Sequence, residues 1–148
     1  MAANAVALIS TLSVYRSFCT FSTTTTIPRF TDTAAQRHLY EQAKRSVALA
    51  YRSGVRVGAG SDFGGGSVRP GHLAWEAESL VDAGLTAWEA LGCLTWQGAD
   101  IIGQPAAGRL EVGGPANIVF VHGDPTIDAA ALWRVWEVVV SDYLPASA

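Results

Sequence analysis

Two kinds of hydrophobic pattern alternate along the first part of the chain. The run AVALISTLSVY, residues 5–15, is short and rich in apolar and β-branched residues, which is typical of a buried strand. Residues 31–54 instead predict a helix, with N-cap candidates between Thr31 and Thr33 and Gly54 as the residue that ends it. Its apolar stripe follows helical spacing and comprises Leu39, Ala43, Val47 and Ala50. The pattern VRVGAG at 55–60 then predicts a second short strand.

Helical patterns dominate residues 71–103. Residues 71–83 predict a helix that Gly84 ends. The apolar face of that helix comprises Leu73, Ala77, Leu80 and Val81. The sequence TAWE forms a capping box, because the Thr86 side chain can bond the Glu89 N–H and Glu89 can reach back. The helix that it opens is expected to direct Trp88, Leu91 and Leu94 inward, and a further short helix is expected over 98–102.

The pattern changes after Gly103, where strands follow one another without helices between them. RLEV at 109–112 and NIVFVHG at 117–123 flank a Gly-Gly-Pro turn, and LWRVWEVVVSD at 132–142 adds a third strand-like run. The chain therefore predicts a small β unit after an α/β part, with a boundary near 104–108.

The order strand, helix, strand, helix, helix predicts parallel strands with crossover helices. In such folds, ligand sites gather at the carboxyl ends of the strands. Asp62 follows the second predicted strand at that edge, within the glycine-rich stretch GAGSDFGGG. Glycines there let the backbone approach a ligand closely. From its position alone, an aspartate after a strand is more often expected to cap the following turn or helix.

Composition excludes several classes of protein. At 148 residues the chain is one ordinary domain in length, and its net charge of −3 includes no basic stripe that would bind nucleic acid. No apolar run approaches the roughly 20 residues of a membrane span. Cys19 and Cys93 have neither metal nor redox spacing, which favours a reduced, cytoplasmic setting. Residues 1–31 lack acidic side chains and contain Arg16 and Arg29, so a transit peptide competes with the predicted strand.

Several of these segments together resemble the C-terminal part of the metal-dependent amidohydrolase superfamily, most of all its imidazolonepropionase-like and related cytosolic members. GSD at 60–62 resembles the end of the last barrel strand, and LVDAGLTAWEALGCLTWQGADIIG at 80–103 resembles the helical stretch that follows. GRLEVGGPANIVFVHGDP at 108–125 resembles the return into a flanking β-sandwich. AVALISTL at 5–12 resembles the preceding barrel strand, which favours the strand over the transit peptide.

The resemblance implies a (β/α)8 barrel with a small β-sandwich, and zinc or another divalent metal at the barrel mouth. It also implies hydrolysis of a non-peptide C–N bond, such as that of a cyclic amide, in a small-molecule substrate by metal-activated water. Asp62 matches the aspartate that serves as metal ligand and general base in this family. This role for Asp62 is chemically consistent, because a metal lowers the pKa of bound water and a nearby carboxylate can accept the proton that the water releases.

The sequence departs from the family at the other metal ligands. It has only three histidines and no His-x-His pair, and its only lysine, Lys44, lies in a predicted helix and not at a strand end. His38 and His122 are expected to be structural or exposed. The loop after Asp62 supplies the candidate substrate-binding residues: Gly64, Gly65, Arg69 and His72.

We therefore expect residues 1–104 to form the last two strand–helix units of a TIM-type barrel, and residues 105–148 to form part of a β-sandwich. A whole barrel takes about 250 residues, so this chain is expected to be a C-terminal fragment with an incomplete site. Its expected partner is an N-terminal barrel portion or a second copy. The alternative is a non-catalytic interaction module that keeps the scaffold and binds no metal.

Overall fold

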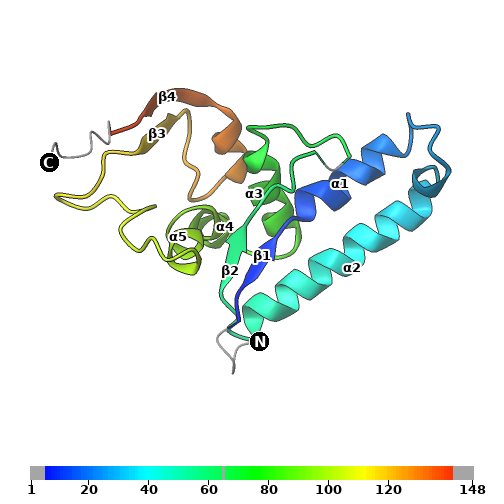
Figure 1. The fold of residues 1–148 in the computed structure, drawn as a ribbon, viewed down its shortest axis with the longest axis horizontal. Coiled ribbons are helices and arrows are strands. Elements are labelled where there is room, and N and C mark those ends of the chain that lie inside the picture. Colours follow the sequence, from blue (N-terminus) through cyan, green and yellow to red (C-terminus); the bar gives the residue numbers. More distant parts are fainter. Residues whose placement is uncertain (1–5, 65, 142–148) are drawn as a thin grey trace, which may run out of the picture.

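A parallel pair of strands lies at the centre of the computed structural model, which describes residues 6–64 and 66–141. Strand β1 (Leu8–Ser10) pairs with β2 (Val57–Ala59), with Ile9 opposite Gly58. The crossover between them runs through helices on one side of the pair, as Figure 1 shows. These are α1 (Leu12–Phe21), the short 3-10 turn η2 (Pro28–Phe30) and α2 (Thr33–Arg52). The predicted alternation of parallel strands and helices is thus confirmed as an α/β fold.

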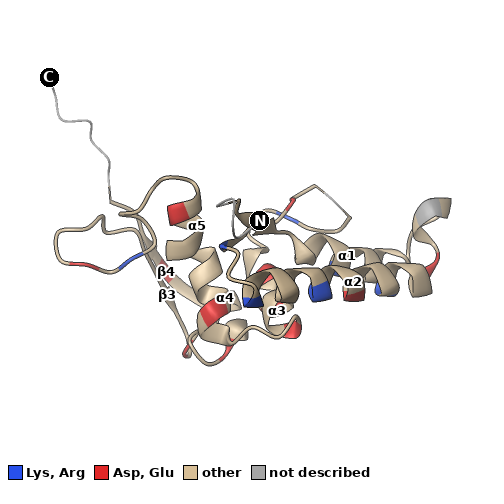
Figure 2. Ribbon diagram, turned by 90° about the horizontal axis from the view of Figure 1, so that it is seen from below, with Lys and Arg blue, Asp and Glu red and all other residues tan. Residues whose placement is uncertain are grey.

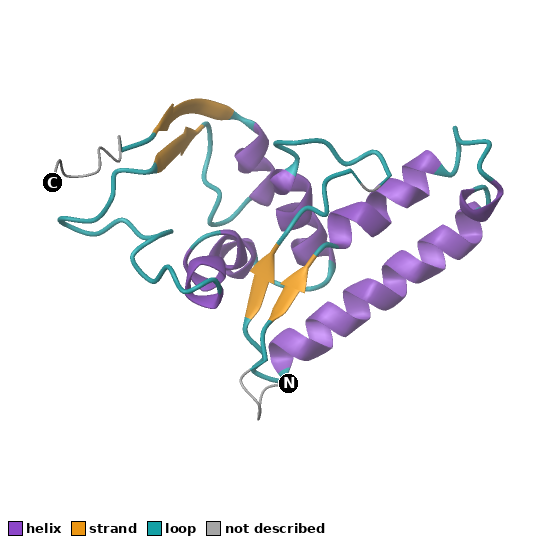
Figure 3. Ribbon diagram, in the orientation of Figure 1, coloured by secondary structure: helices purple, strands orange, loops and turns teal. Residues whose placement is uncertain are grey.

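Helices also follow β2, and a two-stranded antiparallel sheet ends the described chain (Figure 3). The helices are α3 (Leu73–Asp82), α4 (Ala87–Leu94) and α5 (Trp96–Ile101). The sheet comprises β3 (Ile118–Val121) and β4 (Val135–Val139), with the 3-10 turn η3 (Ala129–Trp133) between them. Because each sheet has only two strands, both sheets leave strand edges without a partner in the described residues.

The first predicted strand is correct in position but too long. Only Leu8–Ser10 pairs with β2, and the chain turns into α1 at Leu12. The reason is a tertiary contact: the Glu76 carboxylate on α3 accepts hydrogen bonds from the backbone N–H groups of Leu12 and Ser13. These are among the N–H groups that a helix start leaves unsatisfied, so the acceptor favours a helix where the local pattern favours a strand.

Helix α2 confirms the predicted caps and corrects its predicted buried face. Asp32 at the N-cap accepts from the Ala35 N–H at 2.9 Å, and Gly54 has a φ of 75° after the last turn. Val47 is buried as expected, but Leu39 is exposed and Tyr40 is buried in its place. The buried stripe has rotated by about one position, which places the larger Tyr40 ring in the core.

The capping box of α4 is present in both directions, between Thr86 and Glu89. The inward face of this helix was predicted only in part, because Leu94 packs against the core but Trp88 is 52% exposed. Ala90 and Cys93 take the buried positions, since close packing against β2 and α3 leaves room only for small side chains. On α3, Ala77 and Leu80 are buried as predicted, whereas Leu73 and Val81 are partly exposed.

The C-terminal unit exposes more apolar surface than a folded unit usually does. Residues 109–112 form no strand, contrary to prediction, and Leu110 is 79% exposed. The two later predicted strands are confirmed in part, as β3 and β4. Every residue of β4 is exposed. A strand gains stability from neighbouring strands, and residues 109–112 find none beside them in the described chain. The final predicted run extends past residue 141, outside the described residues.

Acidic and basic residues both occur along the part of the chain that the structure describes. Figure 2 shows acidic and basic positions interspersed along α2 and on the loops. None of the helices in the described residues combines the length and the apolar composition that a bilayer crossing needs.

Raising the pH is expected to destabilise the core. Burial is the main cause that raises the pKa of Tyr40 from 10.0 to about 12, and that of the Cys93 thiol from 9.0 to about 11. Both groups are neutral when protonated and become anions when they lose the proton. Burial disfavours the anion in the folded chain, so the unfolded chain loses these protons at lower pH. Their contribution to stability is complete below about pH 9 and is lost as the pH rises through 11 and 12. Urea unfolding between pH 8 and about pH 11 should show this decline.

A matched pair of variants tests how much of this loss of stability at high pH comes from Tyr40. Tyr40→Phe should flatten the decline above pH 10, and Tyr15→Phe, at a partly exposed position on α1, should leave it unchanged. An unaltered decline in Tyr40→Phe would contradict the assignment.

Candidate functional site

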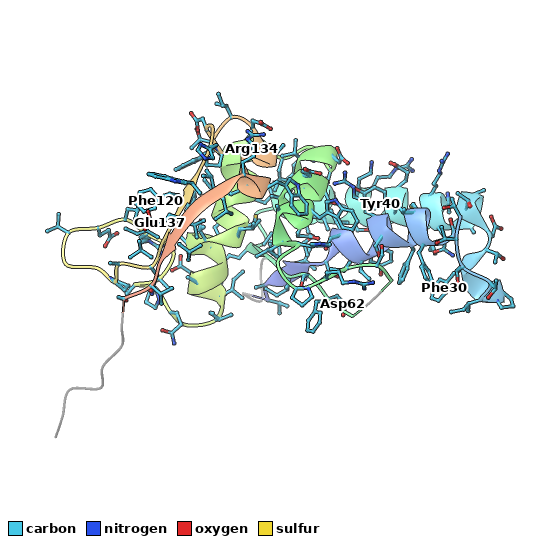
Figure 4. The ribbon with its side chains drawn as sticks, turned by 90° about the horizontal axis from the view of Figure 1, so that it is seen from above. Phe30, Tyr40, Asp62, Phe120, Arg134 and Glu137 are labelled. Carbon is cyan, nitrogen blue, oxygen red and sulfur yellow. The ribbon has the colours of Figure 1, made fainter. Side chains whose placement is uncertain are left out.

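Asp62 lies on the loop that leaves the carboxyl end of β2, beside the carboxyl end of β1. The Gly60 N–H donates to the Ser10 carbonyl oxygen at 2.7 Å, which extends the pairing almost to Asp62. Asp62 is exposed and has a φ of 45°, the only positive φ of a non-glycine residue among those described. Aspartate tolerates this left-handed region better than most residues, and such backbone positions concentrate at functional sites. Figure 4 places Asp62 well away from the labelled residues of the β3–β4 unit.

The loop after Asp62 is held against α1. The Ser67 N–H donates to Ser17 Oγ at 3.3 Å, and Val68 is buried. Gly66 has a φ of 58°, and a Cβ at that position would collide with Ser17 Oγ and approach the Phe18 ring to 3.0 Å. Only glycine fits this contact, so Gly66 allows the loop to pack closely on α1.

His72 is occupied by structural contacts. It holds the N-cap position of α3, and its Nδ1 accepts from the Arg69 N–H at 3.4 Å. Its ring packs edge-on against Trp75 and Trp133, with ring centroids 5.4 Å and 5.6 Å away. Its side chain makes no capping hydrogen bond to α3, so these contacts hold the ring by packing.

The other predicted substrate-binding residues that the structure describes do not form a common binding site. Arg69 and Gly64 are exposed on the same loop, and Gly65 lies outside the described residues. His38 is exposed on α2, and His122 is exposed with its ring 6.2 Å from that of Trp136.

The described residues of this chain do not by themselves fit a metal ion. Among them, no group of three or more His, Cys, Asp or Glu side chains is placed to hold one. Structural and catalytic sites for zinc use three or four protein ligands, and Asp62 could supply one. Any metal at this edge would need ligands from another polypeptide segment.

Sequence reasoning missed the most buried acidic group, Glu76. Its side chain is 0% exposed and accepts three hydrogen bonds, from Ser10 Oγ at 2.5 Å, Leu12 N at 2.9 Å and Ser13 N at 2.6 Å. The sequence did contain an indication that Glu76 is buried. It stands three residues after Leu73 and four before Leu80, on the predicted apolar face of the helix. A carboxylate on a buried helical face requires donors, which the sequence pattern does not locate.

A second acidic residue on α3, Glu78, joins the two parts of the chain. Its Oε2 accepts from Arg16 Nη1 on α1, and its Oε1 accepts from Trp133 Nε1 on η3, both at 2.7 Å. The Arg16 guanidinium also lies over the Trp75 ring, 5.6 Å from the ring centroid. The α/β part and the β unit therefore share a packed polar and aromatic junction.

An apolar groove of about 810 Å³ lies between α4, α5 and β3. Trp88, Leu91 and Leu94 line it, which explains why these apolar residues are not fully buried. None of the predicted site residues lines this groove, so it is separate from the edge that carries Asp62.

Comparison with solved structures shows the fold shared by this chain and larger proteins. A Xaa-Pro dipeptidase with methionine bound in its active site superposes with a TM-score of 0.75 at 23% identity, over 90% of this chain and 32% of that one. An amidohydrolase superposes with a TM-score of 0.68 at 20% identity, over 91% of this chain and 34% of that one.

Comparison with curated proteins gives shorter matches. The uncharacterized proteins Rv2915c of Mycobacterium tuberculosis and Mb2939c of Mycobacterium bovis are each 39% identical over 72 residues. Those residues cover 49% of this chain and 19% of each relative, so the match spans about a fifth of the relatives' length. The profile of the amidohydrolase family, in contrast, matches residues 7–142, nearly the whole chain. The chain therefore belongs to the amidohydrolase family.

Proposed function

We propose that this chain is the C-terminal portion of a metal-dependent amidohydrolase that hydrolyses a C–N bond of a small-molecule amide, such as a cyclic amide. The observation that carries the proposal is the position of Asp62, exposed and left-handed at the carboxyl edge of two parallel strands. In parallel α/β folds this edge is where catalytic side chains meet the substrate. Asp62 would supply one metal ligand and accept a proton from the attacking water.

The same proposal explains why the site is incomplete. In this proposal the two parallel strands and their helices would be the last two units of an eight-unit barrel, and the β3–β4 unit would be part of the flanking sandwich. The missing ligands would come from an N-terminal barrel portion, or from a second copy of the chain. Both would cover strand edges that the described residues leave open.

A second candidate is an interaction module without catalysis. Two observations favour it: the described residues hold no metal-binding group, and β4 is exposed along its whole length. Exposed apolar surface of this extent marks a binding surface in many soluble proteins.

Co-expression tests the two candidates. The chain would be produced with a mycobacterial relative from which the segment that aligns with this chain has been removed. If the proposal is correct, the purified complex contains a stoichiometric divalent metal and hydrolyses small cyclic amides, and a chelator abolishes both properties. A stable, metal-free complex without hydrolysis would favour the interaction module. Tight zinc in a monomer of this chain alone would show that its own residues complete a site.

A further inference from the structure

The fully buried carboxylate of Glu76 joins three elements at the edge that carries Asp62. Glu76 belongs to α3, Ser10 is the last residue of β1, and Leu12 and Ser13 are the first residues of α1. The Glu76 Oε1 atom accepts from both Ser10 Oγ and the Leu12 N–H, and Oε2 accepts from the Ser13 N–H. Each carboxylate oxygen therefore has a donor supplied by the β1–α1 connection.

Burial of this group needs a physical reason, because removal of a carboxylate from water is costly unless hydrogen bonds replace the hydration. The start of α1 offers such a replacement. Its first N–H groups have no partner within the helix, and the helix dipole is positive at that end. The Ser10 hydroxyl adds a short, charge-assisted bond. These contacts fix where β1 ends, where α1 begins and how both sit on α3.

The loop that carries Asp62 rests on the two elements that Glu76 fixes. The loop begins where the Gly60 N–H bonds to the Ser10 carbonyl oxygen. It is held again where the Ser67 N–H bonds to Ser17 Oγ on α1, and where Gly66 packs on Ser17 with no room for a Cβ. A change in the position of β1 or α1 is thus transmitted to both sides of Asp62.

We propose that Glu76 is the positioning residue for the Asp62 loop, and acts through the end of β1 and the start of α1. That the loop forms part of a catalytic site rests on the proposed function. The positioning role itself concerns only this chain and can be measured without metal or substrate.

Glu76→Gln tests this role because a glutamine side chain has one terminal oxygen that accepts hydrogen bonds, whereas the carboxylate has two. Its NH2 group would face at least one backbone N–H of Leu12 or Ser13. In the ¹⁵N-labelled full chain, we expect the amide exchange protection of Leu12 and Ser13 to fall at least about tenfold. We also expect the backbone order parameters of the Asp62 loop to fall from about 0.85 to below about 0.6, while the amides of α2 keep their protection.

Glu78→Gln is the matched control. It is the same substitution on the same helix, and Glu78 also bonds to α1, but through Arg16 and not through the helix start. It should leave the Asp62 loop and the Leu12 and Ser13 amides unchanged. If Glu76→Gln alters only Leu12 and Ser13, or alters nothing, Glu76 is no more than a local helix cap and the proposal is wrong.

Ser10→Ala covers the case in which Glu76→Gln unfolds the chain. It removes one of the three donors and leaves the carboxylate with both backbone N–H groups. A smaller loss of order in the Asp62 loop, with α2 intact, supports the proposal, and an unchanged loop overturns it. If the loop depends on Glu76 but co-expression yields no hydrolysis, only the proposed function fails.

Discussion

Asp62→Asn is expected to lower the kcat of the co-expressed, metal-loaded complex by about 10²- to 10⁴-fold, the usual contribution of a positioned general base. Asparagine keeps the size of the side chain and tolerates the left-handed backbone at this position, so the loop should retain its conformation. The amide cannot accept a proton from water at neutral pH, and it is a weaker metal ligand than a carboxylate. The loss should therefore fall on kcat much more than on the affinity of the two chains for each other.

The measurement is steady-state hydrolysis of a cyclic amide, together with the metal content of the variant complex. Asp124→Asn is a suitable control, because Asp124 is also exposed but bonds Thr126 in the β unit. It should retain full activity. If Asp62→Asn hydrolyses the substrate as fast as the unaltered complex, Asp62 has no catalytic role.

Leu80→Ala is expected to reduce the free energy of unfolding by about 3 kcal/mol, within the range for fully buried leucines. Leu80 lies on α3 with no exposed surface and packs in the core with Val57 of β2 and Leu12 of α1. Its removal would leave a cavity at the point where α3 supports both the strand pair and α1. A domain of this size is stabilised by only about 5–15 kcal/mol, so the loss should be plain.

Urea unfolding followed by circular dichroism measures this effect. Leu49→Ala is the matched control, since Leu49 lies on α2 and is 62% exposed. It should change the free energy of unfolding by no more than about 0.5 kcal/mol. Equal effects of the two substitutions would show that α3 does not form the core in solution.

Local signals in the sequence were sufficient for most of the α/β part. The capping box at Thr86 and Glu89, the glycine stop at Gly54 and the helical spacing of α3 each act within a few residues, so their meaning does not depend on distant parts of the chain. The sequence also identified Asp62 as a candidate site residue. It directly follows a short strand, and in a parallel sheet that position lies at the carboxyl edge of the strands.

The errors occurred where distant residues decide the outcome. The extended pattern at 5–15 gave no sign that α1 begins at Leu12, because the acceptor for its first N–H groups is Glu76, more than sixty residues away. Similarly, Trp88 fits an inward helical position by spacing alone. It is displaced to the surface because the space against β2 and α3 admits only Ala90 and Cys93.

The strand predicted at 109–112 shows the same dependence on distant partners. Its alternating pattern is adequate for a strand, but strand stability comes from the neighbours with which it pairs. The described residues supply none, so Leu110 remains exposed.

By itself, the sequence determined the family, the parallel pair of strands with most of the helices around it, and the place of Asp62 directly after the second strand. These depend on short-range backbone preferences and on motifs that are contiguous in the chain. Only the tertiary structure decided which side chains are buried and that His72 packs against tryptophans. It alone also revealed that Glu76 joins β1, α1 and α3. The physical reason is that burial and hydrogen-bond satisfaction are set by segments that meet in space, which one-dimensional spacing does not encode.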